Sequence, residues 1–239
     1  MIGQLIAWIL VSVLGGVTAS LAGFGIGSLM TPALATRYSL ADAVLAVSIP
    51  HAIATAVRCW RLRRSIEWRL LRSFGIASAI GGTVGALFFL RSEAALGTIL
   101  GLLLIATGIS GLTSWTRHVR LGTAGSAMLG AASGFFGGIA GNQGGLRAAA
   151  LTTWRLSPAA FVATSTAVGL MVDAARLPVY IAGSHADWRL LALPIATGTA
   201  GVLLGTLLGE RLLLRLSAER FRQIVSVLIT ALGIWLLAR

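Results

Sequence analysis

The feature that most limits the folds open to this chain is a succession of long apolar segments with few charges between them. Each segment is about 20 residues long, and a helix of that length spans or nearly spans the roughly 30 Å hydrocarbon core of a bilayer. Only 11% of the 239 residues are charged, against about 25% in soluble domains. The sequence therefore predicts an all-α polytopic membrane protein, with long helices at residues 4–21, 41–57, 70–90, 94–115, 123–139, 159–181, 190–208 and 221–237.

Two apolar pieces, 26–36 and 146–154, are long enough for only half a crossing. Each follows a glycine cluster, GFGIG at 23–27 and GNQGG at 141–145. Closely spaced glycines destabilise a helix, and backbone groups released in lipid must find partners or line a cavity. A short helix that starts at such a break directs free N–H groups and its positive dipole end toward the membrane interior. We therefore expect each cluster to be a helix break that favours an anion.

An internal repeat divides the chain into two halves, 1–118 and 119–239, within one membrane domain. The run EWRLL at 67–71 recurs as DWRLL at 187–191, an offset of 187 − 67 = 120 residues. The run AVS at 46–48 matches ATS at 163–165, an offset of 165 − 48 = 117, and the two glycine clusters correspond as well. Internal duplication is the usual construction of a secondary transporter.

The arginines predict the orientation of the two halves. The stretch 58–72 holds six arginines and one glutamate, and 210–222 holds four arginines, so the positive-inside rule places both in the cytoplasm. The loop around His185, the repeat partner of the basic 58–72 loop, then lies outside. This predicts inverted halves, each with four long helices and one short glycine-led helix; parallel halves with four spans each remain the alternative. The net charge of +12 is interpreted as a topology signal, with no nucleic-acid partner.

Glycine pairs spaced four apart predict close contacts between helices, because a small residue at each end of this spacing lets two backbones approach. The pairs are Gly81 and Gly85, Gly97 and Gly101, Gly130 and Gly134, and Gly201 and Gly205.

Polar residues near the breaks are the candidate ligands of an anion. Ser28 adds a hydroxyl to the first break, and Asn142 and Gln143 add amide donors to the second. Arg147 lies in an otherwise apolar run, where an arginine is costly and expected to be functional. Its guanidinium either faces the ligand, reaches the membrane surface, or neutralises Asp173.

A second group of polar residues lies in the helices that follow the breaks. Asp173 and Arg176 have the spacing of neighbours on one helix face, which favours a mutual ion pair, with gating or proton coupling as the alternative. His51 follows Pro50 among apolar residues, and either a structural or a binding role is open to it. The hydroxyls Ser48, Thr55, Ser165 and Thr166 either line a cavity or bond to backbone carbonyls one turn earlier.

The sequence resembles the TauE/SafE sulfite exporter family, the TSUP transporters. The resemblance rests on the run GFGIGSLMTP at 23–32, its repeat near mid-chain, and the acidic-Trp motif that follows each copy. Membership implies a bacterial inner-membrane carrier for sulfur-containing anions such as sulfite, sulfoacetate, thiosulfate or organosulfonates, without a cofactor. This chain departs from the family pattern at Asn142, Gln143 and Arg147, and it has Ala149 where the first half has Pro32.

The resulting hypothesis is a carrier, with no enzymatic activity, that exports the anion by alternating access. Arg147, Asn142, Gln143 and the backbone of Gly25, Gly27 and Gly144 would hold the anion, together with the hydroxyls and His51. Alternatives are an anion channel, a carrier for another small anion such as a carboxylate, and an intramembrane hydrolase built on Ser28 and His51. The lone Cys59 excludes a cysteine metal cage and we expect no metal; the expected partners are the lipid bilayer and a possible second copy of the chain.

Overall fold

A computed structural model describes residues 2–89, 98, 101–102, 105–106, 108–109, 112–113, 122–141, 144, 147, 151, 154, 156–212, 223, 226–227, 230–231, 233–234 and 237–238. Every regular element within these residues is helical. Five helices are long and apolar enough to cross a membrane: Gly3–Leu21, Leu40–Ser65, Trp68–Phe88, Ala159–Gly183 and Trp188–Gly209. The predicted all-α polytopic class is confirmed.

The helices that form in the described part of the chain follow the apolar segments of the sequence. The elements are α1 (Ile2–Ala22), α2 (Ile26–Ala35), α3 (Leu40–Leu62), a 3₁₀ turn (Arg63–Ser65), α4 (Trp68–Leu70), a π-helical segment (Leu71–Gly75), α5 (Ile76–Phe89), α7 (Thr123–Ala140), α9 (Pro158–Gly183) and α10 (Trp188–Leu212). The predicted helices at 94–115, 146–154 and 221–237 lie largely outside the described residues.

Helices α3 and α9 begin with the same serine cap. The Ser39 hydroxyl accepts a hydrogen bond from the backbone N–H of Asp42 at 3.0 Å, and the Ser157 hydroxyl accepts one from Ala160 at 3.2 Å. Such a cap satisfies an N–H group that has no partner inside the helix. The two caps lie 157 − 39 = 118 residues apart.

Glycines bring the helices together in two tight pairs, α5 with α7 and α1 with α10. A Cβ atom on Gly81 or Gly85 of α5 would run into a backbone carbonyl of α7, and one on Gly205 would run into a carbonyl of α1. Close helix contact therefore requires glycine at these positions, as the spacing predicts. Gly97 lies outside the described residues; the facing carbonyls belong to Ala131, Phe135 and Val13.

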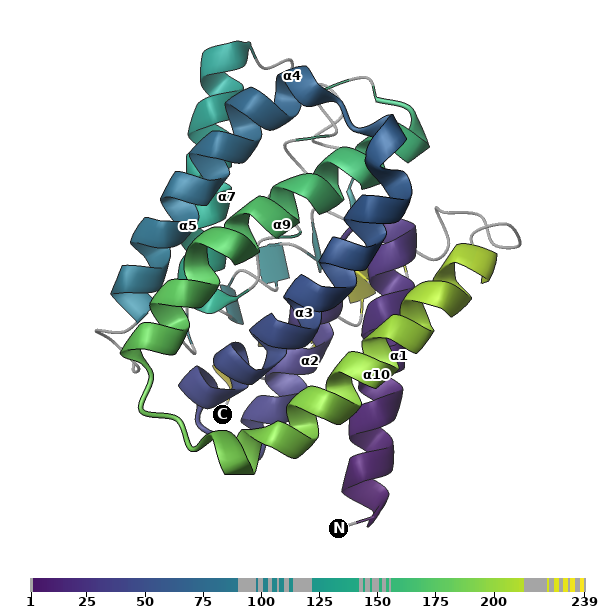
Figure 1. The fold of residues 1–239 in the computed structure, drawn as a ribbon, viewed down its shortest axis with the longest axis vertical. Helices are drawn as coiled ribbons and strands as arrows, with labels where there is room; N and C mark the ends of the chain where they lie inside the picture. The colour runs from purple at the N-terminus through teal and green to yellow at the C-terminus, as the bar shows by residue number, and fades with distance from the viewer. Residues whose placement is uncertain are drawn as a thin grey trace.

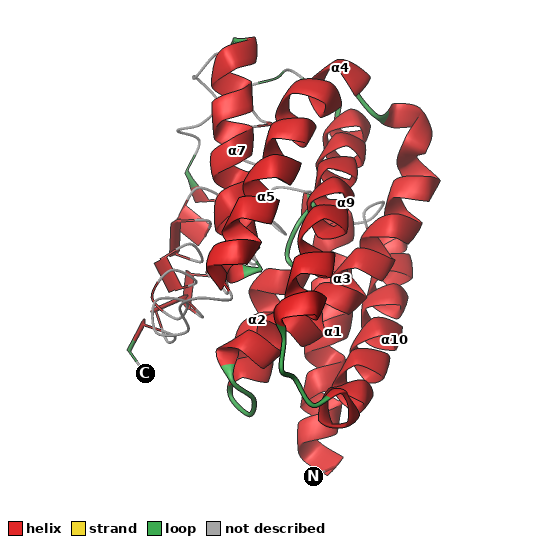
Figure 2. Ribbon diagram, turned by 60° about the vertical axis from the view of Figure 1, so that its left-hand side comes forward, coloured by secondary structure: helices red, strands yellow, loops and turns green. Residues whose placement is uncertain are grey.

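Helices α3 and α9 cross the middle of the molecule, between the α5–α7 pair and the α1–α10 pair (Figures 1 and 2). In Figure 1, α3 rises from the turn after α2 toward α4, whereas α9 descends toward the turn before α10. The outer helices expose large apolar side chains, including Leu10, which is 58% exposed, Ile80, 62%, and Leu204, 51%. Such an apolar exterior fits hydrocarbon better than water.

Candidate functional site

The first predicted helix break is present. Helix α1 ends at Ala22, and Gly23 and Gly25 adopt φ angles of 77° and 131° before α2 begins at Ile26. These angles lie in the region that side chains disfavour, and a Cβ atom on Gly25 would lie 2.5 Å from Thr18 Cγ2. Gly25 is the residue before the first turn of α2, and it provides no side-chain cap for the N–H groups there.

The second predicted break follows α7. Gly141 has a φ angle of 67°, and its N–H donates to the Gly137 carbonyl at 2.9 Å. Asn142 and Gln143 lie outside the described residues. A Cβ atom added to Gly144 would overlap the side chain of Phe24, in the first glycine cluster. The two glycine clusters, which are over 100 residues apart in the sequence, are therefore in contact.

Arg147 is buried, with 2% of its surface exposed, and it reaches the end of α1. Its Nε donates to the Ser165 hydroxyl at 3.0 Å and its Nη2 to the Gly23 carbonyl at 3.4 Å. Ser165 donates to the same carbonyl at 3.3 Å. The partners of Arg147 are thus neutral oxygens, and its Nη1 has no hydrogen-bond partner among the described residues.

Gly169 of α9 lies beside this Nη1. A Cβ atom at Gly169 would lie 3.1 Å from Nη1 and 3.5 Å from both Cζ and Nη2 of Arg147. An alanine would therefore press on the guanidinium. No pattern in the sequence singles out this glycine, because its role depends on the side chain of Arg147, 22 residues earlier.

Arg176 has a carboxylate partner, unlike Arg147. Its Nε and Nη2 donate to Asp173 Oδ1 at 3.1 and 2.8 Å, which confirms the ion pair expected from their spacing. His51 Nδ1 lies 2.6 Å from the other carboxylate oxygen, Oδ2. His51 thus joins α3 to α9. No sequence pattern linked residues 51 and 173, which belong to different halves.

The same cluster holds the C-terminal end of α7. Arg176 Nη1 donates to the Gly137 carbonyl at 2.7 Å, and the Tyr180 hydroxyl donates to the Gly138 carbonyl. The last carbonyls of a helix often lack partners within it. Arg176 adds a second donor to the Gly137 carbonyl, which also accepts from Gly141, and Tyr180 provides a donor to the Gly138 carbonyl. Tyr180 was not among the expected residues, although its position one turn after Arg176 places it on the same face of α9.

The other candidate residues have different surroundings. Ser48 donates to the Val44 carbonyl at 2.7 Å, so its hydroxyl is engaged within its own helix. Gly27 and Ser28 are buried in the first turn of α2. Thr166 accepts from Arg58 Nε at 3.1 Å, and Thr55 Oγ1 has no hydrogen-bond partner among the described residues.

Arg58 does not lie in the loop where the sequence analysis placed it. The orientation argument assigned it to a cytoplasmic loop, but α3 continues to Leu62 and Arg58 is 2% exposed within that helix. The helix continues beyond the apolar run, and Arg58 is buried on the side where α3 packs against α9 and its Nε donates to Thr166. The exposed arginines of this region include Arg63, Arg64 and Arg69.

Apolar spanning helices around buried charges and broken helices define a multi-pass membrane protein. The family model for the sulfite exporter TauE/SafE matches residues 8–236, nearly the whole chain. The chain therefore belongs to the TauE/SafE sulfite exporter family, a family of transporters, as the resemblance implied. Neither a curated protein nor a solved structure matches it.

Proposed function

We propose that this protein is a secondary transporter that exports small sulfur-containing oxyanions across the bacterial inner membrane, with no enzymatic activity. The observation that carries the proposal is the burial of Arg147 together with the nature of its hydrogen-bond partners. Its guanidinium is buried, its described partners are neutral oxygens, and one nitrogen has no described partner. A buried guanidinium without a directly bonded carboxylate is costly inside a membrane protein, and a bound anion would supply that partner.

The surroundings of Arg147 suit an oxyanion. A guanidinium presents its donors in a planar fork that can hold two oxygens of sulfite, thiosulfate or a sulfonate together. The start of α2, at Gly25, Gly27 and Ser28, offers backbone donors and the positive end of a helix dipole. In the second break, Gly144 packs against Phe24, and the amides of Asn142 and Gln143 complete the proposed site.

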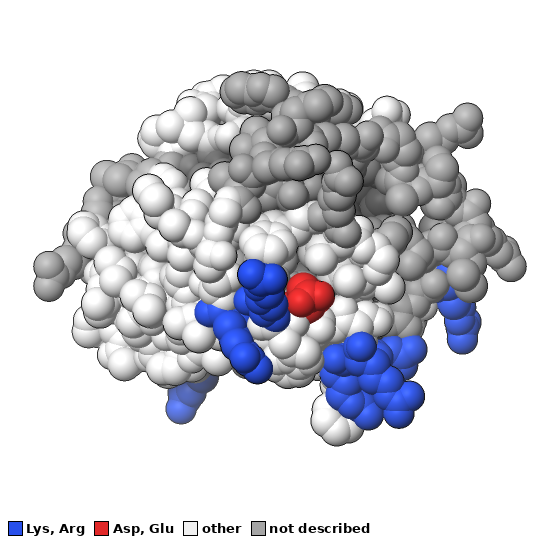
Figure 3. All heavy atoms as spheres, turned by 90° about the horizontal axis from the view of Figure 1, so that it is seen from above, with Lys and Arg blue, Asp and Glu red and all other residues white. Residues whose placement is uncertain are grey.

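The proposed mechanism is alternating access between two inverted halves, 1–118 and 119–239. The matching serine caps support α3 and α9 as equivalent helices of the two halves, and their opposite courses in Figure 1 support inversion. The α3–α4 and α9–α10 connections also lie at opposite ends of the molecule (Figure 1). Seen from above, the end that carries α4 displays clustered arginines (Figure 3), which favours the cytoplasmic side for that end.

The contact between His51 and Asp173 links α3 of one half to α9 of the other. We assign this pair and Arg176 a coupling or gating role, because a movement of one half relative to the other would act directly on the contact between His51 and Asp173. Export needs little additional driving force. With the cytoplasm negative, each negative charge that leaves gains about 2.3 kcal/mol per 100 mV.

The test combines ligand binding and transport by the purified protein. Sulfite, thiosulfate, sulfoacetate, taurine and small carboxylates are screened for thermal stabilisation, because a ligand at 100 times its Kd stabilises by about 2.7 kcal/mol. The stabilising anion is then followed in proteoliposome efflux and counterflow. Arg147→Ala should abolish both stabilisation and efflux. Arg147→Lys, which keeps the charge without the fork, should retain part of each.

The matched control is Arg189→Ala, which removes an exposed arginine at the start of α10 and should change neither measurement. Unchanged efflux in a folded Arg147→Ala protein would overturn the assignment of Arg147. Stabilisation by carboxylates alone would move the substrate to that class. Efflux without saturation or counterflow would replace the carrier by a channel.

A further inference from the structure

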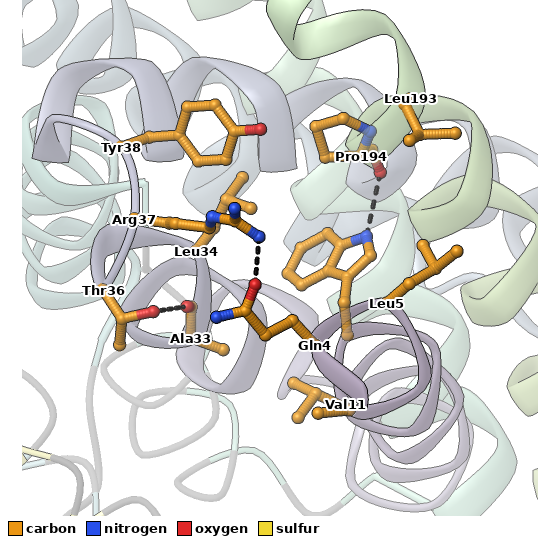
Figure 4. Close-up of a pocket in the computed structure, with 12 residues that line it drawn as sticks. Gln4, Leu5, Val11, Ala33, Leu34, Thr36, Arg37, Tyr38, Leu193 and Pro194 are labelled. Atoms are coloured by element: carbon orange, nitrogen blue, oxygen red, sulfur yellow. Dashed lines mark hydrogen bonds between the residues drawn. The ribbon is translucent and has the colours of Figure 1, made fainter. Parts of the chain in front are cut away.

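A cavity of about 760 Å³ lies away from Arg147, between the first half of α1, the end of α2 and the start of α10 (Figure 4). Its apolar wall includes Leu5, Trp8, Val11, Leu34 and Leu193. Two hydrogen bonds hold the three helices around it. Trp8 Nε1 donates to the Pro194 carbonyl at 3.1 Å, and the Tyr38 hydroxyl donates to the Leu190 carbonyl at 3.5 Å.

Water is a poor occupant for this cavity. Most of its wall is apolar and offers water few hydrogen-bond partners, and a buried water needs two to four of them. The lining residue Leu193 is 61% exposed. Apolar side chains next to lining residues in the sequence are exposed as well, Ile6 at 52% and Leu10 at 58% on α1 and Leu190 at 64% on α10, as expected for helices that face hydrocarbon. A hydrocarbon chain can therefore enter from the bilayer.

One end of the cavity is polar and positively charged. Arg37, in the turn between α2 and α3, donates to the Gln4 side-chain oxygen, and both side chains face the cavity (Figure 4). The Thr36 and Tyr38 side chains contribute to the same end. None of the described residues that line the cavity is acidic. Because arginine carries five donors, Arg37 retains donors for a phosphate beyond its bond to Gln4.

We infer that this cavity binds an anionic phospholipid of the bilayer, with the phosphate on Arg37 and an acyl chain along Trp8, Val11 and Leu34. The arrangement follows the shape of such a lipid. The charged group lies in a turn at the end of a helix, where headgroups are found, and the apolar wall extends from there along α1. The bond between Arg37 and Gln4 orients the guanidinium before the lipid arrives.

The test is native mass spectrometry of the detergent-purified full chain, titrated separately with dioleoyl phosphatidylglycerol, dioleoyl phosphatidylcholine and inorganic phosphate. We expect one phosphatidylglycerol to bind at least about tenfold more tightly than phosphatidylcholine, a difference of about 1.4 kcal/mol. Arg37→Gln should abolish the preference. Arg189→Gln, which removes an exposed arginine at the same end of the molecule, should preserve it.

Val11→Trp, which fills the cavity from α1, should displace the lipid and leave Arg37 intact. Equal binding of the two lipids, or a preference that survives Arg37→Gln, would overturn the inference. Binding of inorganic phosphate as tight as that of the lipid would reduce the site to a headgroup pocket and overturn it too. Loss of anion efflux in Arg37→Gln with unchanged lipid binding would make the cavity part of the transport path instead. The proposed function is judged separately by the Arg147 variants.

Discussion

Arg147 and Arg176 occupy similar places but have different partners. The guanidinium of each reaches the end of another helix and donates to a backbone carbonyl there. Arg147 donates to Gly23, just after α1, and Arg176 donates to Gly137, in the last turn of α7. Both are at most 2% exposed. Arg176 also pairs with Asp173 through two hydrogen bonds, whereas the partners of Arg147 in the described chain are neutral.

This difference is why we propose Arg147, and not Arg176, as the arginine that binds the ligand. The C-terminal end of a helix carries partial negative charge, so an arginine beside such an end is stabilised where the chain breaks inside a membrane. A full countercharge is needed in addition. Asp173 provides it for Arg176 through a direct ion pair, and we propose that the substrate is the directly bonded anion of Arg147. Burial of an arginine in a membrane protein is therefore informative only together with the charge of its partners.

The largest expected effect comes from breaking the paired cluster. Asp173→Asn removes the countercharge and leaves Arg176 buried beside a neutral amide, which should cost about 3–5 kcal/mol of stability. The loss is measured as thermal denaturation in detergent, without substrate. Glu67→Gln, at an exposed acidic residue, is the control and should have little effect. If Arg147→Ala destabilised the protein as much as Asp173→Asn, the distinction between the two arginines would fail.

A smaller effect is expected at Gly169. A methyl group there would lie 3.1 Å from Arg147 Nη1, so Gly169→Ala should weaken anion binding about tenfold, or 1.4 kcal/mol. Alanine favours a helix over glycine by about 1 kcal/mol, so the variant should not lose stability. Binding is measured by thermal shift against anion concentration. Gly3→Ala, where no atom lies within 4 Å of the added methyl, is the control, and unchanged affinity at Gly169→Ala would place the anion elsewhere.

The smallest effects compare two serines at matching positions of the repeat. Ser165→Ala removes the hydroxyl that binds Arg147 Nε and should lower anion affinity a few fold, about 1 kcal/mol for one hydrogen bond. Ser48→Ala removes only a bond to the preceding turn of its own helix and should leave affinity unchanged. Equal effects of the two substitutions in the efflux assay would show that Ser165 does not position Arg147.

Local patterns predicted the features that depend on neighbouring residues. The glycine cluster at 23–27 predicted the break before α2, and the spacing of Asp173 and Arg176 predicted their ion pair. Contacts between distant segments had no such signal. His51 and Asp173 are 122 residues apart, and Arg147 and Gly23 are 124 apart. The sequence therefore leaves the roles of these residues open between structural and functional alternatives.

The sequence by itself determined that this protein lies in a bilayer, where its described helices and the break at Gly23 to Gly25 lie, and its family. Apolar length, glycine content and motif spacing are properties of short stretches of chain. Only the tertiary structure decided which charges are compensated. Compensation depends on which oxygens surround each guanidinium, and helix packing brings those oxygens together. The packing of the helices places Asp173 between His51 and Arg176, and it leaves one nitrogen of Arg147 without a described partner.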